Sequence, residues 1–326
     1  MNTIYIKRGE EYELVEQVAT IGFFDGVHRG HKFLISRVID EAGRSGMASA
    51  VITFDRHPHQ VLQADYQPQL LSTLDEKLLL LSKTRIDNSF VLHFDASLAS
   101  LSAHDFMQEV LCKQLNVKKL IIGYDNRFGH NRSETFEHYV QYGKELGVEV
   151  IRADAFLPDD EKVSSSVIRN YLREGKIEVA NRLLGYNYTI ESRIVNGYQN
   201  GRKMGFPTAN LDVSGCQQLL PASGVYAVMV RLKDSVEWKR GMMNVGQRPT
   251  FNGTTTSVEV NLFNFTGNLY GQELFVSFVS KIRDEHKFES LEALAEQLKQ
   301  DKEHINHLLD EAYNIQENII NKQQDS

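Results

Sequence analysis

The sequence predicts an α/β domain over residues 1–185 and a β-barrel domain over residues 186–326, with a helix after the barrel. Two observations predict this. Up to Gly185, short apolar strands alternate with helical stretches, which is typical of a parallel sheet covered on both faces. After Gly185, strand-like segments follow one another without intervening helices and are separated by glycines, which is typical of an antiparallel barrel. A chain of 326 residues is long enough for two domains, each with its own core.

The strands of the first domain are predicted from short continuous apolar runs, as expected of strands buried on both faces. These runs lie at 18–22, 48–54, 89–94, 119–123 and 148–151. Helical spacing of apolar residues predicts helices at 30–45, 75–83, 102–115, 135–146, 167–172 and 176–184. Ser102, followed three residues later by Asp105, predicts one helix N-cap, and Gly185 predicts a C-cap. Because ligands of parallel sheets bind beyond the carboxyl ends of the strands, the loops there form the candidate site.

The second domain is predicted to contain strands with partly alternating character. They lie at 188–195, 224–232, 237–245, 256–262 and 273–282. The stretch 290–320 repeats leucine and isoleucine at helical spacing, which predicts a helix that packs on the barrel.

The composition is ordinary for a soluble enzyme. A formal net charge of −7 does not favour nucleic acid as the main partner, so any phosphate binding must be local. The only cysteines, Cys112 and Cys216, lie far apart, which argues against a disulfide framework and fits a reducing cytoplasm. The first 17 residues mix charges, and no apolar run reaches 18 residues, so we expect neither a signal peptide nor a membrane span. Nothing in the sequence indicates an oligomeric state.

The run Gly-Phe-Phe-Asp-Gly-Val-His-Arg-Gly-His at 22–31 joins the first apolar strand to a helix. A glycine-rich turn before a helix presents backbone N–H groups and the positive end of the helix dipole, which favours phosphate. His28 and His31 lie on one face of the first turn, where each can donate to a phosphate oxygen. An arbitrary histidine pair is more often solvated or structural, but the flanking glycines and Asp25 favour the phosphate site. A zinc site is not favoured, because no third ligand lies at metal spacing.

Two further polar and aromatic loops follow strands of the same predicted sheet. Residues 53–58 follow the second strand and residues 123–129 follow the fourth, at the edge that carries the first motif. Each loop alone is a weak signal, but the three together predict a pocket. The serines at 164–166 are adequately explained as a helix N-cap, whereas Arg169, one turn later, could bind a phosphate with two hydrogen bonds.

A second candidate site lies at 201–210, where two glycines and two basic residues precede Pro207, Thr208 and Asn210. Thr208 and Asn210 point to one side if the segment is extended, and their oxygens are hard ligands suited to Mg²⁺ held with ATP phosphates. The alternative is an ordinary barrel hairpin with a proline turn. No Gly-x-x-x-x-Gly-Lys-Ser/Thr run occurs, which excludes a P-loop kinase.

The 22–31 run resembles the His-x-Gly-His signature of adenylyl- and cytidylyltransferases. Its longer form resembles the first motif of bacterial bifunctional riboflavin kinase/FAD synthetases. The loops at 53–58 and 123–129, and the Ser-Ser-Ser-Val-Ile-Arg run at 164–169, resemble further motifs of that family. The departures from the family pattern are Arg56 for Pro, Asn126 for Phe and Ser166 for Thr.

The second half resembles the riboflavin kinases of the same family. The matching runs, in family order, lie at 207–210 (Pro-Thr-Ala-Asn), 224–227, 244–250 and 269–271. The catalytic glutamate of the family corresponds to Glu259, which spacing alone would not select, because a strand glutamate is more often a surface residue. Asn261 and Asn264 stand where the family commonly has His and Asp.

The resemblance implies a Rossmann-like nucleotidyltransferase domain and a flavokinase-type barrel. The barrel would phosphorylate riboflavin with Mg-ATP to give FMN, and the first domain would adenylylate FMN to FAD with release of diphosphate. The implied catalytic residues are Glu259, His28 and His31. In the first domain, the implied ATP-binding residues are Gly22, Phe23, Asp25, Gly30, Ser164, Ser165, Ser166 and Arg169, and the flavin-binding residues are Phe54, His57, Asp125 and Arg127. In the barrel, the implied ATP-binding residues are Gly201, Lys203, Gly205 and Pro207, and the Mg²⁺ ligands are Thr208 and Asn210.

Three other functions remain open. A single-activity transferase with a barrel that only binds flavin is disfavoured by the intact Thr208, Asn210 and Glu259. A flavin or nucleotide sensor without catalysis would predict loss of His28 or His31, and both are present. A nucleotidyltransferase for a phosphopantetheine or phosphocholine substrate is disfavoured by the barrel motifs.

Overall fold

The computed structural model describes residues 1–63, 65–67, 69–124, 127–130, 134–156, 162–195, 205–250, 253–267 and 269–324. The chain divides into two compact units, Met1–Val167 and Ile168–Ser326.

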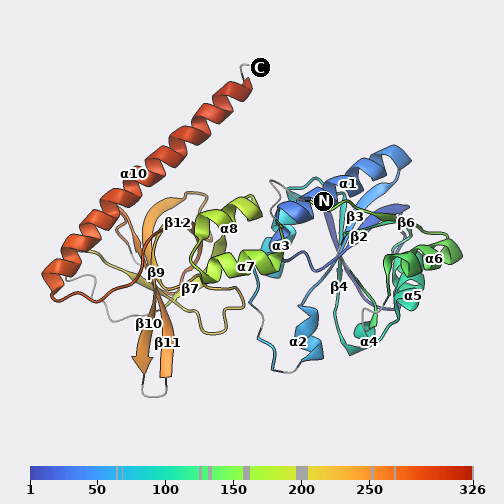
Figure 1. Ribbon diagram of the computed structural model, residues 1–326, viewed down its shortest axis with the longest axis horizontal. Coiled ribbons are helices and arrows are strands. Elements are labelled where there is room, and N and C mark those ends of the chain that lie inside the picture. Colours follow the sequence, from blue (N-terminus) through green and yellow to red (C-terminus); the bar gives the residue numbers. More distant parts are fainter. Residues whose placement is uncertain are drawn as a thin grey trace. The chain divides into compact units, whose positions relative to one another are not determined.

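The first unit contains a parallel sheet, as predicted, and this sheet has six strands rather than the five predicted (Figure 1). The strands are β1 (Asn2–Ile6), β2 (Gln17–Ile21), β3 (Ala48–Phe54), β4 (Asn88–Leu92), β5 (Val117–Ile122) and β6 (Glu149–Arg152). Their order across the sheet is β1-β4-β3-β2-β5-β6. The strand order reverses between β2 and β5, and a crevice at such a reversal is where ligands bind in open α/β sheets.

Helices cover both faces of this sheet. On one face lie α1 (Arg29–Ser45) and α3 (Leu74–Ser82), and on the other lie α5 (Ala103–Asp105), its continuation η2 (Phe106–Gln114) and α6 (Phe136–Leu146). Two neighbouring residues of β2 point to opposite faces of the sheet: Val18 packs with side chains of α1, and Ala19 packs with side chains of η2. The strands are therefore buried on both sides, which is why they read as continuous apolar runs. The shorter elements are η1 (Asp25–Val27), α2 (Pro58–Leu62) and α4 (Ala96–Ala99).

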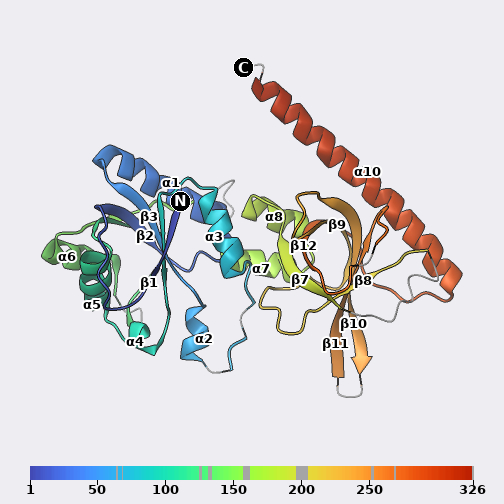
Figure 2. The ribbon, with the colours of Figure 1, turned by 180° about the vertical axis from the view of Figure 1, so that it is seen from behind.

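Two features of the first unit differ from the sequence prediction. Strand β1 was not predicted, because it lies at the sheet edge beside β4 and three of its five residues are exposed (Figure 2). The helix predicted at 102–115 is a short α-helix that continues as a π-helix from Phe106. Its predicted cap is confirmed, because the Ser102 hydroxyl accepts a hydrogen bond from the Asp105 N–H at 3.1 Å.

The second unit is built around a closed antiparallel barrel with the strand order β10-β11-β8-β7-β12-β9, which confirms the predicted fold (Figure 2). The strands are β7 (Thr189–Val195), β8 (Ala209–Leu211), β9 (Gly224–Leu232), β10 (Lys239–Thr250), β11 (Gly253–Leu262) and β12 (Glu273–Arg283). The short β8 was not predicted as a strand. Two helices precede the barrel, α7 (Ser165–Arg173), which spans the division between the units, and α8 (Ile177–Leu184).

The C-terminal helix α10 (Leu291–Gln324) packs on the barrel, as predicted (Figure 1). Its Ile305 and Leu309 belong to one buried cluster with Phe206, Val225 and Met242 of the barrel. Burial of this apolar stripe is what holds a helix of this kind in place. In the described part of the chain, no helix combines the length and apolar character that crossing a membrane requires.

Candidate active sites

The loop after β2 is held in an unusual backbone conformation. Phe24 and Val27 have φ values of 54° and 37°, in the left-handed region that side chains other than glycine rarely adopt. Such a conformation costs free energy and persists only where neighbouring groups hold it. The Asp25 carboxylate provides this support, since it accepts hydrogen bonds from the N–H groups of Leu71 (2.9 and 3.1 Å) and Ser72 (3.2 Å).

The loop is tied at two further points. The Gly26 N–H donates to the Ser72 hydroxyl at 3.0 Å, and the Ser165 hydroxyl donates to the Asp25 carbonyl at 3.0 Å. Ser165 is the first residue of α7, and the Ser164 hydroxyl accepts from the Val167 N–H at 3.3 Å. The predicted N-cap of this helix is therefore present. Arg169 lies one turn further along α7.

Replacement of Asp25 by alanine is expected to destabilise this loop. It leaves the buried N–H groups of Leu71 and Ser72 without the carboxylate, and an unsatisfied buried donor costs about 1–3 kcal/mol. We expect a lower melting temperature, measured by thermal unfolding, together with loss of the FAD formation that the sequence motifs lead us to expect of this domain. Asp25→Asn keeps one acceptor oxygen and should lose less of both. An Asp25→Ala protein as stable as the wild type would contradict this role.

The two motif histidines lie against each other. Their rings stack with centroids 3.5 Å apart and an interplanar angle of 18°. His28 is the N-cap of α1, and its Nδ1 accepts a hydrogen bond from the His31 N–H at 3.3 Å. A nitrogen that accepts carries no proton, so a neutral His28 ring has its proton on Nε2. The sequence pattern thus placed both rings correctly beside the helix N-terminus, and the structure adds a capping function to His28.

His31 is half-buried, its Nδ1 atom is buried, and among the described residues this atom has no hydrogen-bond partner. Burial, followed by the charges of His28 and Lys77, holds the pKa of His31 well below its ordinary value. His31 is therefore a neutral imidazole at physiological pH, and a neutral ring can donate through one nitrogen only. A buried polar atom without a partner is uncommon and calls for an explanation, and a group bound at this site would supply the missing partner.

Gly30 is needed for close packing at this point. A Cβ atom there would lie 3.2 Å from two atoms of the His28 ring and 3.5 Å from the Val163 carbonyl oxygen. Gly22, at the end of β2, similarly faces the Phe24 ring at 3.2 Å. Both glycines allow the backbone to pass close to aromatic side chains of the loop.

A cavity of about 360 Å³ opens at the carboxyl ends of the strands in the first unit. Four of the predicted site residues line it, namely Gly22, Phe23, Phe54 and Arg127. The rest of its wall is mostly apolar, with Phe94, Leu98, Leu101, Phe106 and Phe128. Phe128 belongs to the loop 123–129 that the sequence assigned to the pocket, whereas the other four were not identified, because their spacing is that of ordinary core residues.

His57, the other predicted flavin residue that the structure describes, is the N-cap of α2. Its Nδ1 accepts from the His59 N–H at 3.2 Å, and its ring meets the edge of Phe23 with centroids 4.8 Å apart. It therefore supports the cavity wall through Phe23. Arg56, one of the departures from the family pattern, lies beside Asp55 at 3.6 Å. Asp125 and Asn126 lie outside the described residues.

Lys77 of α3, which no sequence pattern singled out, contacts two residues that line this cavity. Its side chain is only 2% exposed, and its ammonium donates to the carbonyl oxygens of Phe23 (3.1 Å) and Phe54 (2.8 Å). It also lies 4.2 Å from the centroid of the Phe23 ring, a cation–π contact. Burial lowers the pKa of Lys77 from 10.5 to about 8, while Asp25 and Asp55 oppose this shift. The sequence feature that could have pointed to Lys77 is its place directly before four consecutive leucines, Leu78–Leu81, in a predicted helix.

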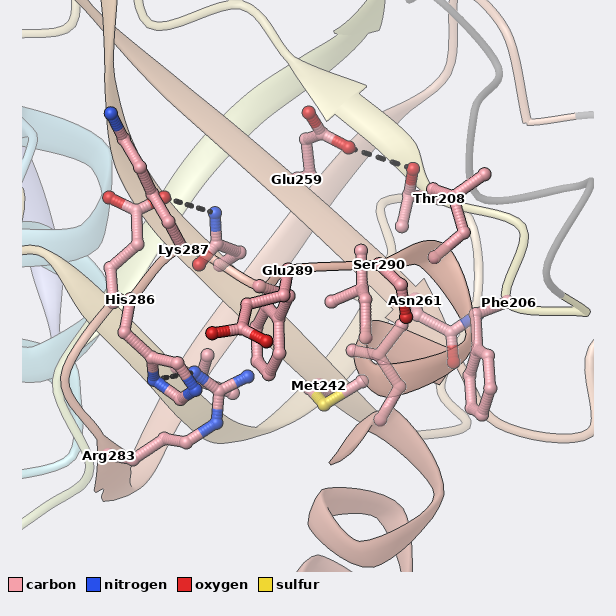
Figure 3. Close-up of a pocket in the computed structure, with 17 residues that line it drawn as sticks. Phe206, Thr208, Met242, Glu259, Asn261, Arg283, His286, Lys287, Glu289 and Ser290 are labelled. Carbon is pink, nitrogen blue, oxygen red and sulfur yellow. Dashed lines mark hydrogen bonds between the residues drawn. The ribbon is translucent and has the colours of Figure 1, made fainter. Parts of the chain in front are cut away.

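In the barrel, strands β8 and β11 bring the predicted kinase residues together (Figure 3). Glu259 pairs in register with Asn210, and the Thr208 hydroxyl donates to the Glu259 carboxylate at 2.9 Å. The Asn261 amide donates to the Pro207 carbonyl at 2.7 Å and so holds the segment that carries Thr208. Asn261 thus has a structural function in this chain.

Thr208 and Glu259 line a cavity of about 670 Å³ in the second unit. Its apolar wall includes Phe206, Val225, Met242 and Leu294, and Asn244, Glu285 and His286 are among its polar side chains (Figure 3). Gly205 precedes this wall with φ +78°, a conformation that favours glycine. Gly201 and Lys203 lie outside the described residues.

The segment after β12 forms one side of this cavity, and the sequence analysis did not identify it. Arg283 forms an ion pair with Asp301 of α10 at 2.9 Å, and this carboxylate is 2% exposed. The Arg283 guanidinium also lies 3.3 Å from the His286 Nδ1 atom, and the Asn244 amide donates to Glu285 at 3.3 Å (Figure 3). These contacts tie the cavity wall to both α10 and β10.

Two family models match this chain, and the boundary between them lies in the same region of the sequence as the division between the two units. Residues 11–167 match the family model of FAD synthetase, and residues 184–309 match that of riboflavin kinase. A crystal structure described as a macrolide-efflux protein from Streptococcus pneumoniae matches with a TM-score of 0.83 and 31% identity, over 93% of this chain and 98% of that one.

Curated relatives match most of the chain. The bifunctional riboflavin kinase/FMN adenylyltransferase of Haemophilus influenzae is 38% identical over 284 residues, which are 87% of this chain and 91% of that protein. The Escherichia coli enzyme of the same name is 36% identical over 87% of this chain and 90% of its own length. The Bacillus subtilis enzyme is 34% identical over 93% and 96%, respectively. The chain therefore belongs to the family of bifunctional riboflavin kinase/FMN adenylyltransferases.

Proposed function

We propose that the barrel of this bifunctional enzyme converts riboflavin and ATP to FMN and ADP at the cavity of Glu259 and Thr208. The first domain then converts FMN and ATP to FAD and diphosphate at the site of His28 and His31. The observation that carries this proposal is the pair of separate sites, because each unit has its own cavity beside its own motif residues. Both activities of the family use ATP.

In the kinase step, Glu259 accepts the proton of the ribityl hydroxyl as that oxygen attacks the γ-phosphorus of ATP. The bond from the γ-phosphorus to the bridging oxygen breaks, and ADP leaves. A general base must lie within hydrogen-bond reach of the proton that it accepts, and Glu259 lies on the cavity wall. The apolar side chains of Phe206, Val225 and Met242 suit the flavin ring.

The residues around Glu259 fit Mg²⁺ bound with ATP. Thr208 and Asn210 supply uncharged oxygen donors next to one carboxylate, and Mg²⁺ prefers a few such ligands together with phosphate oxygens and water. Thr208 and Asn210 would hold the ion, which would neutralise charge on the transferring phosphoryl group. Gly201, Lys203, Gly205 and Pro207 would bind the nucleotide around it.

In the adenylyl transfer step, an oxygen of the FMN phosphate attacks the α-phosphorus of ATP, and diphosphate leaves. The attacking phosphate is already an anion, so the step needs no protein base. His28 and His31 would donate hydrogen bonds to the α-phosphate as its charge increases. The first-unit cavity of Phe54 and Arg127 is apolar enough for the flavin ring.

The remaining residues of the first domain would place ATP. Gly22, Phe23, Gly30 and Ser164–Ser166 would contact it directly, and Asp25 would act through the loop that its carboxylate holds. The proposed contacts of His57 and Asp125 with flavin and of Arg169 with the triphosphate stay predictions.

The first test is incubation of the whole chain with riboflavin, ATP and Mg²⁺, followed by chromatography. We expect FMN to appear first and FAD to follow. FMN without FAD would indicate a single-activity kinase, and bound but unchanged flavin would indicate a sensor. Supplied FMN should be converted to FAD without riboflavin, which separates the second reaction from the first.

The domain boundary at 185/186 can be tested with fragments. We expect residues 186–326 to make FMN from riboflavin but no FAD. A fragment that begins at Ile168 should be more stable, because α8 is then retained and the Asn181 amide donates to the Phe278 carbonyl of β12 at 2.9 Å. Melting temperatures and kinase rates of both fragments check this. A folded fragment 186–326 supplied with Mg²⁺ but inactive as a kinase would overturn the boundary.

A further inference from the structure

We propose that Lys77 is a positioning residue for FMN adenylylation, whose charged ammonium clamps the loop after β2 to the carboxyl end of β3 at the flavin cavity. This inference rests on the proposed function of the first domain. Lys77 does not line the cavity, but the two residues whose carbonyls it binds, Phe23 and Phe54, both do. We therefore infer that it acts through the loop after β2 and the end of β3.

The geometry favours a clamp. The parallel pairing of β2 with β3 ends at Ile21 and Ile52, so Phe23 and Phe54 lie beyond the last residues that join these two strands, although Phe54 still pairs with Leu92 of β4. There, one ammonium joins the two backbones, with Nζ 3.1 Å from the Phe23 oxygen and 2.8 Å from the Phe54 oxygen. Thr53 supports the same junction, since its hydroxyl also donates to the Phe23 oxygen at 3.1 Å.

The clamp also determines where the Phe23 ring lies. The Lys77 ammonium is 4.2 Å from the Phe23 ring centroid, and the ring edge contacts His57. The next residue, Phe24, has left-handed backbone torsions and meets the His31 ring with centroids 5.1 Å apart. Movement of the Phe23 backbone would therefore displace both the cavity wall and the histidine pair. A misplacement of about 1 Å can reduce a rate by about 10²-fold.

The clamp depends on charge. Asp25 of η1 and Asp55 after β3 face Lys77 and favour its charged form, whereas burial disfavours it more strongly. His31 of α1 also faces Lys77, and the lysine charge is one of the causes that keep His31 neutral. The pKa of Lys77 is about 8, so the ammonium loses its proton in the alkaline range in which assays are practicable.

Activity and stability should respond to pH in opposite directions. Above a pH of about 8 the clamp loses its charge, so adenylylation should decline. The pKa of Lys77 is lower in the folded protein than its ordinary value of 10.5, so the unfolded chain binds more protons between these two values. This difference in bound protons makes the free energy of unfolding rise with pH from about 8 to 10.5. If the Lys77 charge served only to stabilise the fold, its loss above a pH of about 8 would lower the stability as well as the activity.

The test uses the full-length enzyme and three variants. Lys77→Arg keeps a charge that does not titrate in this range, Lys77→Met removes the charge at similar length, and Lys83→Met removes an exposed lysine one residue after the same helix. FAD formation from supplied FMN and FMN formation from riboflavin are measured separately from pH 7 to about 10, over the range of the shifted lysine pKa. The melting temperature of each protein is measured over the same range.

In the wild type and in Lys83→Met, we expect kcat/KM for FAD formation to fall about tenfold per pH unit above a pH of about 8, as for loss of one proton. In Lys77→Arg this decline should be absent. In Lys77→Met, FAD formation should be about 10²-fold below the wild-type rate at pH 7 and should lack this alkaline decline, with FMN formation unchanged. The rise of the melting temperature above a pH of about 8 should be reduced in both Lys77 variants.

Two results would overturn the role of Lys77. One is an alkaline decline in Lys77→Arg identical to that of the wild type. The other is a Lys77→Met protein that keeps more than about a tenth of the wild-type FAD formation, a loss well short of that expected for a misplaced site. If Lys77→Met does not fold, the pH profile of Lys77→Arg decides alone. A wild-type protein that makes no FAD at pH 7 would instead refute the proposed function of the first domain.

Discussion

Replacement of Glu259 by glutamine should reduce riboflavin phosphorylation by about 10²–10⁴-fold, the range expected for loss of a general base. The glutamine amide has the size of the carboxylic acid but cannot accept a proton at neutral pH. It can still accept the hydrogen bond from the Thr208 hydroxyl, so the pairing of β8 and β11 should persist. The fall should therefore appear mainly in kcat, and the melting temperature should change little.

The kinase rate, the adenylylation rate and the melting temperature of Glu259→Gln together distinguish a catalytic role of Glu259 from a structural one. FMN adenylylation occurs in the other domain, so its rate in Glu259→Gln should equal that of the wild type. Glu292→Gln, which alters an exposed glutamate of α10, is the matched control and should leave both rates unchanged. If Glu259 only held the barrel, the variant would melt at a lower temperature with a modest kinetic change. A kinase rate above about a tenth of normal lies outside the general-base range and would remove Glu259 from its catalytic role.

Replacement of His28 and His31 by alanine should abolish most FAD formation while FMN accumulates. Loss of one donor to a developing oxyanion typically costs about 10²–10³ in rate, so the double variant should lose at least this much. Kinase activity is the internal control, since it belongs to the barrel. Near-normal FAD formation by the double variant would be incompatible with the proposed role of the pair.

The single variants distinguish the two functions of His28. Its Nδ1 caps α1, so His28→Ala removes a helix cap, which typically costs about 1 kcal/mol, together with a phosphate donor. His28→Asn keeps a side chain that is well suited to capping but removes the imidazole. We expect His28→Asn to melt near the wild-type temperature and still to lose FAD formation. A His28→Asn protein that melts near the wild-type temperature and keeps normal FAD formation would assign His28 to capping alone.

Local sequence patterns were sufficient to predict most of the strands and helices. The strands of the parallel sheet are buried on both faces, so they appear as apolar runs, and β3 was predicted at its observed bounds. The motif at 22–31 was recognised because its glycines and histidines lie close together in the chain. Strands β1 and β8 were missed, because an exposed edge strand and a strand of three residues leave no apolar period.

The sequence by itself determined the two-part organisation, the strand–loop–helix setting of His28 and His31, and the Thr208–Asn210 segment. Only the tertiary structure decided which distant residues serve these segments. It brought the ammonium of Lys77 to the carbonyls of Phe23 and Phe54, across 54 and 23 positions of the chain. It also brought Glu259 to Thr208 across 51 positions. The reason is physical: local spacing records which face of an element is buried, whereas a hydrogen bond between distant residues depends on how the elements pack.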